Sequence, residues 1–112
     1  MAKRIAWSED ELKLALLVCL QIRSEGSEIN KDNPRVIALS DFLRVLNRVD
    51  EESFRTPDGV RGRISYFNKI IEGGIFPDRK SMHTIWEKYK KSESTLLFDC
   101  GKIFLRCNKL VE

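Results

Sequence analysis

Histidine is almost absent from this 112-residue chain, in which His83 is the only one. Nuclease centres that combine histidine with a metal therefore lack the side chains they need. No Cys-x-x-Cys pair occurs among the three cysteines, Cys19, Cys100 and Cys107. The sequence thus predicts no metal site and no other cofactor, and the apolar surroundings of the cysteines predict buried free thiols.

Long apolar runs are also missing. The longest, Leu14–Leu20, has seven residues, whereas a helix needs roughly 20 apolar residues to cross a bilayer. The start Met1-Ala2-Lys3-Arg4 lacks the apolar core of a secretion signal, so we expect a cytoplasmic protein with no membrane partner. Hydrophobic residues make up 42% and charged residues 33%, which is typical of one globular domain over residues 1–112.

Helix start signals recur along the chain. Ser8-Glu9-Asp10-Glu11 has the pattern of a capping box. Asn33-Pro34 and Thr56-Pro57 each place a capping side chain before a proline that suits the first turn of a helix. Ser81 can cap a fourth, short helix. With apolar residues at helical spacing, these signals predict helices over about 9–24, 34–47 and 57–71, and a short helix after Ser81 that contains Met82, Ile85, Trp86 and Tyr89.

The C-terminal segment allows two predictions. A fifth helix can begin near Ser94 or Thr95, and its midpoint would contain Gly101, a weak helix former. A β-hairpin over 95–111 competes with it, because Phe, Ile, Leu and Val also suit strands. The predicted fold class is all-α, with about five helices and a packing or oligomerisation element at 91–112.

Positive charge gathers in one short part of the chain. The net charge is +3, and residues 55–70 contain four basic and one acidic side chain. Within the predicted helix 57–71, Val60, Ile64, Phe67 and Ile71 form an apolar stripe at i, i+4, i+7 and i+11. Helical spacing places Asp58, Gly62, Ser65 and Lys69 on the opposite arc, with Arg61 and Asn68 at one edge and Arg63 and Tyr66 at the other.

A helix with one buried side and one basic side can read duplex DNA, because it is held rigidly while its outer side chains reach bases and phosphates. Helix 34–47 would brace it in a helix-turn-helix-like pair, although the connection exceeds the usual turn. The alternative is an ordinary amphipathic helix with a solvated basic side. The predicted nucleic-acid contacts are Arg55, Arg61, Arg63, Ser65, Asn68 and Lys69.

Two aromatic residues in the fourth predicted helix leave a second question open. Trp86 and Tyr89 are three residues apart and therefore lie on neighbouring positions of the helix surface. Core packing is the simpler interpretation. The alternative is a pocket in which a flipped or modified base stacks on these rings.

Several short segments resemble a known domain. They are Trp7-Ser8, Asn33-Pro34 with Val36–Ser40, Phe54–Val60, Arg63-Ile64 with Tyr66-Phe67, and Asp78–Lys80 followed by Ile85–Glu87. In this order, over residues 5–90, they are similar to the DNA-binding domain that precedes the HNH nuclease in bacterial restriction-type endonucleases. Thr56 stands where that family usually has Asn, and these 112 residues contain no segment that resembles the nuclease.

The resemblance implies a non-catalytic helical module that binds double-stranded DNA, with Arg55, Arg61 and Arg63 among its contacts. A restriction or phage-defence system, target or modified-base sensing, and association with a nuclease domain or subunit are further implications. The other functional hypothesis is a protein-interaction protein, such as a phage or mobile-element inhibitor or a defence-complex subunit. In that case the apolar segment 94–112 would form a homodimer or partner face.

Overall fold

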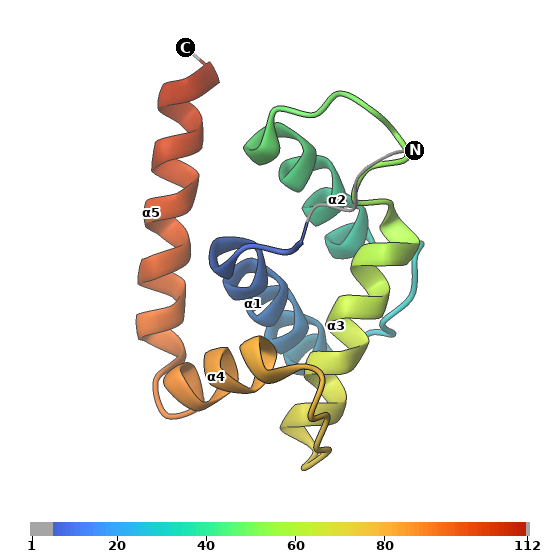
Figure 1. The fold of residues 1–112 in the computed structure, drawn as a ribbon, viewed down its shortest axis with the longest axis vertical. Coiled ribbons are helices and arrows are strands. Elements are labelled where there is room, and N and C mark those ends of the chain that lie inside the picture. The colour runs from blue at the N-terminus through green and yellow to red at the C-terminus, as the bar shows by residue number, and fades with distance from the viewer. Residues whose placement is uncertain (1–5, 112) are drawn as a thin grey trace.

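Four helices surround a central one in the computed structural model, which describes residues 6–111 and side chains as far as Cys107 (Figure 1). No strand occurs in this part of the chain, so the β-hairpin prediction is wrong and the all-α prediction is confirmed. The helices, in chain order, are α1 Glu9–Glu25, α2 Pro34–Asn47, α3 Pro57–Ile71, α4 Lys80–Tyr89 and α5 Glu93–Val111.

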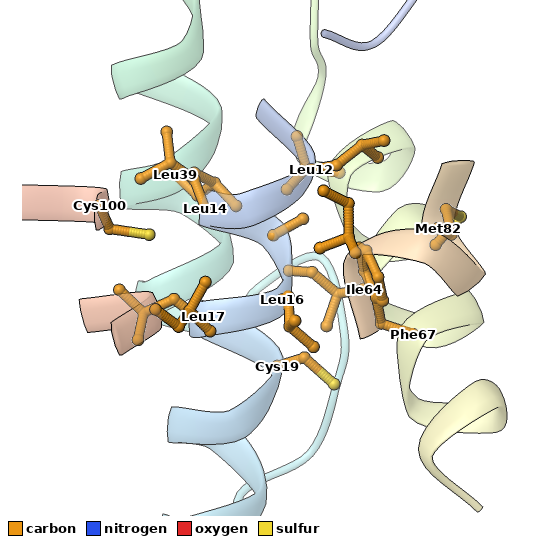
Figure 2. Packing of buried hydrophobic residues seen from close by; sticks show 14 of the residues in the cluster. Leu12, Leu14, Leu16, Leu17, Cys19, Leu39, Ile64, Phe67, Met82 and Cys100 are labelled. Carbon is orange, nitrogen blue, oxygen red and sulfur yellow. The ribbon is translucent and has the colours of Figure 1, made fainter. Parts of the chain in front are cut away.

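Helix α1 is the centre of the core. It packs against each of the other four helices, and Figure 2 shows why. Leu14 and Leu17 point towards Leu39 of α2 and Cys100 of α5, whereas Leu16 points towards α3. A helix that is covered on all sides must be apolar on all sides. This explains the seven-residue apolar run, which belongs to a buried helix.

The predicted caps are largely confirmed. Ser8 and Glu11 form the reciprocal capping box, with Glu11 N 3.2 Å from Ser8 Oγ. Asn33 and Thr56 accept hydrogen bonds from the first turns of α2 and α3. The predicted cap at Ser81 is wrong, because α4 begins at Lys80 and Ser81 is its second residue. The Arg79 amide donates to the Phe76 carbonyl at 2.9 Å, and this turn sets the earlier start.

Helix α5 forms because its apolar residues have helical spacing. Leu96, Cys100, Ile103 and Cys107 are buried at i, i+4, i+7 and i+11. A strand would instead bury alternate residues. The Ser92 hydroxyl accepts from the Thr95 amide at 3.3 Å and supports the start of the helix, which is one residue before the predicted Ser94.

Helix α3 is held on three sides by α1, α2 and α4. Val60, Ile64 and Phe67 are fully buried, as the stripe predicts. Ile70, rather than the predicted Ile71, completes the buried set. Ile71 is partly buried and still packs against the core.

Candidate nucleic-acid interface

The outward arc of α3 is open to solvent. Lys69 is exposed, and Arg61 and Ser65 are partly exposed, so all three are accessible to solvent. A Cβ built at Gly62 would meet nothing within 4 Å, which shows that the middle of the arc is unobstructed. The arrangement predicted for this side of the helix is therefore present.

Arg61 is held by a weak local contact. Its Nε donates to Asp58 Oδ1 at 3.1 Å, and the two side chains are 37% and 70% exposed. An exposed pair of this kind contributes about 0.2–1 kcal/mol, so a phosphate can replace the carboxylate easily. The Lys69 ammonium lies 5.5 Å from the centre of the Tyr66 ring and remains accessible.

Arg55 does not lie on this surface, so it is not among the DNA contacts that we propose. Its side chain is only 8% exposed, and its guanidinium donates twice to Glu11, which is 1% exposed. The two distances are 2.6 Å to Oε2 and 3.1 Å to Oε1. Burial works to raise the pKa of Glu11, but the hydrogen bonds from Arg55 and Ser8 outweigh it and hold that pKa below its usual range. Arg55 therefore ties the start of α3 to the start of α1.

Arg63 faces α4 rather than the open arc. Its guanidinium lies 5.1 Å from the centre of the Trp7 ring and is partly buried. Burial, followed by the nearby charges of Arg79 and Arg55, lowers the pKa of Arg63. Arg63 is thus separated from Arg61, with which it was predicted to form one basic surface.

Asn68 has a structural partner. Its Oδ1 accepts from Arg23 Nη1 at 2.5 Å, and its amide nitrogen donates to Glu72 Oε1 at 3.4 Å. These contacts join the end of α1 to the end of α3. Ser65 and Lys69 lie beside this junction in a shallow hollow of about 460 Å³ that also contains Arg23 and Glu28. Asn68 can reach a base only if Arg23 releases it.

The two aromatic residues of α4 have different surroundings. Tyr89 is 1% exposed and its hydroxyl donates to Asp99 Oδ2 at 2.6 Å. This burial removes Tyr89 from the predicted base-stacking pair. Trp86 is partly exposed and packs against the hydrophobic core. The core-packing interpretation therefore describes both residues better.

Sequence reasoning missed two basic residues at the start of α4, Arg79 and Lys80. Arg79 lies 4.4 Å from the centre of the Tyr66 ring, so it extends the positive surface from α3 to the next helix. Lys80 is exposed at the first position of α4. The tripeptide Asp78-Arg79-Lys80 was visible in the sequence, but only the folded chain places it beside α3.

No group of three or more His, Cys, Asp or Glu side chains lies in an arrangement that could hold a metal ion within the described residues. His83 Nε2 accepts from the Phe76 amide at 3.0 Å and ties the loop before α4 to that helix. Between residues 6 and 111, no helix has the length and apolar character required to cross a membrane.

No family model matches the chain, and no curated protein and no solved structure matches it either. The fold and the site define an all-helical domain with one open, basic helix face. The similarity to the endonuclease-associated domain stays a prediction.

Proposed function

We propose that this protein is a non-catalytic module that binds duplex DNA through the outward arc of α3. One observation carries the proposal: Arg61 and Lys69 flank an unobstructed Gly62 on a helix whose other sides are packed. Rigid support and close approach are the two conditions for a helix that enters the major groove.

The packing of α2 on α3 supports a helix-turn-helix-like arrangement. In this arrangement α3 is the reading helix and α2 crosses behind it. The connection runs from residue 48 to residue 56, so this pair has a longer link than the three or four residues of the usual motif. Glu11 and Arg55 fasten the start of α3 and thereby orient it.

Electrostatics give the proposal its measurable form. Arg61 and Lys69 would contact phosphates or guanine edges, and Ser65 between them would add a base contact. Each phosphate that a basic side chain neutralises releases counterions and adds about −0.9 to the slope of log K against log salt. Duplex binding should therefore weaken steeply as salt increases.

The experiment compares two variants that lose the same charge. Arg61→Gln/Lys69→Gln removes both cations from the arc, whereas Arg106→Gln/Lys91→Gln removes one arginine and one lysine elsewhere. Arg106 is a fair match for Arg61, because it is exposed and also pairs with an aspartate, the partly exposed Asp10, at 2.6 Å. Fluorescence anisotropy with a labelled duplex at two salt concentrations provides the readout.

The arc variant should bind roughly tenfold or more weakly, and its salt slope should be shallower by about 1 to 2. The control variant should lose much less. Equal losses in the two variants would show that only net charge matters and would refute the proposed surface. A role in target or modified-base sensing within a restriction or defence system rests on the resemblance alone. The same assay with methylated and unmethylated duplexes tests it.

A second candidate function, protein association, is favoured by the outer side of α5. Leu97, Phe98 and Leu105 are 56%, 66% and 64% exposed, whereas Phe104 is 40% exposed and packs edge-on against Phe42 of α2, with 4.9 Å between the ring centres. Gly101 lies among them, and a Cβ at this position would meet nothing within 4 Å. A glycine inside a helix costs about 0.5–1 kcal/mol relative to alanine, and the described chain gives no packing reason for it.

We propose that a second copy of the chain covers this side of α5. The apolar pattern is symmetric about Gly101, with Phe at three residues and Leu at four residues on each side. An antiparallel twofold pair centred on Gly101 would place Leu97 against Leu105 of the second copy and Phe98 against Phe104 of the second copy. The glycines would let the helices approach closely.

Light scattering across a concentration series tests this pairing. The wild-type protein should dimerise, Phe98→Asp should be monomeric, and Ile75→Asp should behave like the wild type. Ile75 is a suitable control because it is 81% exposed in a loop away from α5. A wild-type protein that stays monomeric, or a dimer that survives Phe98→Asp, would overturn the pairing. If the wild-type protein stays monomeric, this side of α5 would be free to bind a different protein, as expected for an inhibitor or a subunit of a defence complex.

A further inference from the structure

A pocket of about 340 Å³ opens between residues 6–12, α3 and the start of α4. Trp7, Arg63, Arg79 and Lys80 are in its lining. Asp78 is the only carboxylate among the described residues that line it, and its side chain is 79% exposed. The pocket therefore has an excess of positive charge at its walls and one acid at its rim.

The start of α4 adds donors to this pocket. Arg79 occupies the N-cap position and makes no capping hydrogen bond with its side chain. The first amides of a helix have no partner within the helix, so a cap, water or a ligand must accept from them. Ser81 and Met82, which follow in the first turn, also line the pocket. A helix start of this kind attracts an anion.

One guanidinium atom of Arg79 lacks a hydrogen-bond acceptor in the described part of the chain, although the side chain as a whole is 30% exposed. Its Nε is shielded from solvent and has no hydrogen-bond partner among the described residues. The nearest carboxylate oxygen, Oδ2 of Asp78, is 4.0 Å away, beyond hydrogen-bond distance. A buried donor without an acceptor is unfavourable. An anion in the pocket would satisfy it.

Arg63 is the second arginine in the pocket wall. It is partly buried, forms no ion pair with the carboxylates of the described chain, and has only the Met82 sulfur near Nη1, at 4.0 Å. Burial, followed by the charges of Arg79 and Arg55, lowers its pKa, and the charge of Glu11 acts in the opposite direction. The Trp7 ring steadies the Arg63 guanidinium from one side.

We infer that the pocket between Trp7, Arg63 and the start of α4 binds a phosphate group. The guanidinium groups of Arg63 and Arg79 would donate to its oxygens, together with the first amides of α4. The inference goes beyond the proposed function, because Arg63 lies on the α4 side of α3 and Arg61 lies on the open arc. The shared chemistry is a phosphate oxyanion, whether it belongs to an internal phosphodiester or to a terminal phosphomonoester.

The first experiment titrates the whole protein with inorganic phosphate and follows ¹⁵N resonances by NMR. The amides of Lys80, Ser81 and Met82 and the Nε–H groups of Arg63 and Arg79 should shift together and saturate. Arg79→Gln should weaken binding by about tenfold, since one charged hydrogen-bonding group is lost. Arg106→Gln should have no effect. Small shifts spread over the exposed lysines, or equal binding in Arg79→Gln, would overturn the inference.

A second variant keeps the test valid if Arg79→Gln unfolds. Asp78 is exposed, so Asp78→Asn should fold normally and bind phosphate more tightly because the rim loses its negative charge. Weaker or unchanged binding in this variant would contradict the inference.

Two further comparisons are needed. The first separates a terminal phosphate from an internal one, and the second separates the phosphate pocket from the proposed duplex binding. A 5′-phosphorylated oligonucleotide that binds better than its 5′-hydroxyl form indicates a terminal phosphate, and equal binding that still depends on Arg79 indicates the backbone. If phosphate binds but Arg61→Gln/Lys69→Gln leaves duplex binding unchanged, the DNA proposal fails alone. If the arc variant is impaired but phosphate causes no local shifts, the pocket inference fails alone.

Discussion

Replacing Arg55 by glutamine should destabilise the fold strongly. The substitution removes the bidentate contact with Glu11 and leaves a carboxylate that is 1% exposed without its cation. The Ser8 amide and Asn47 would remain as its hydrogen-bond donors. Removing one partner of a buried ion pair costs about 3–5 kcal/mol. At about 4 °C per kcal/mol for a domain of this size, the melting temperature should fall by about 12–20 °C.

Arg48→Gln is the matched control. Arg48 and Arg55 both have a positive φ, 55° and 49°, so any backbone effect of the substitution is similar. Arg48 is exposed, and its replacement should change the free energy of unfolding by less than about 0.5 kcal/mol. Thermal unfolding followed by circular dichroism at pH 7 measures both variants.

The double variant Glu11→Gln/Arg55→Gln isolates the pair. Two amides can hydrogen-bond without a buried charge, so the double variant should be less destabilised than the two single effects added together. Additive effects, or an Arg55→Gln protein that melts with the wild type, would refute the assignment of Arg55 to a structural ion pair.

Three smaller predictions follow from individual residues. Gly62→Ala should raise the free energy of unfolding by about 0.5–1 kcal/mol, because the added methyl group meets no other atom, and denaturant titration measures this effect. The same substitution should weaken duplex binding, measured by anisotropy, because the methyl group stands where DNA approaches the helix closely. The lowered pKa of Glu11 gives stability that is complete above the ordinary carboxyl pKa and is lost as the pH falls through the lowered value. Between pH 7 and acid, the free energy of unfolding of Glu11→Gln should therefore fall less than that of the wild type, which denaturant titration measures. Burial raises the pKa of Cys19 and of Cys100 to about 12, so thiol reagents at pH 8 should label both far more slowly in the native protein than in urea, and equal rates would contradict their burial.

Local signals predicted most of the fold. The caps at Ser8, Asn33 and Thr56 depend on residues within one helical turn, and all three are confirmed. The end of the chain was harder, because α5 is apolar on its buried side and also on its outer side. Two apolar sides obscure the helical period, so the sequence is also compatible with a hairpin. The burial of Leu96 and Cys100 in the core decides for the helix.

The site was less predictable because its decisive contacts are distant in sequence. The sequence predicts that Glu11 is a capping residue, and the structure confirms this. It does not predict that Glu11 also pairs with Arg55, 44 positions away. Arg23 reaches Asn68 across 45 positions. Residue type and helical spacing identified the cations and the open arc. Only the packing of α1 against α3 shows which of these side chains have partners inside the protein.

The most direct test of the central claim is an NMR titration of the ¹⁵N-labelled protein with a short DNA duplex. The claim is that the open arc of α3 meets the DNA. The account predicts that the backbone resonances of Arg61, Gly62, Ser65 and Lys69 shift most and that those of the outer side of α5 stay in place. Shifts confined to α5, or an unchanged spectrum at low salt, would contradict it.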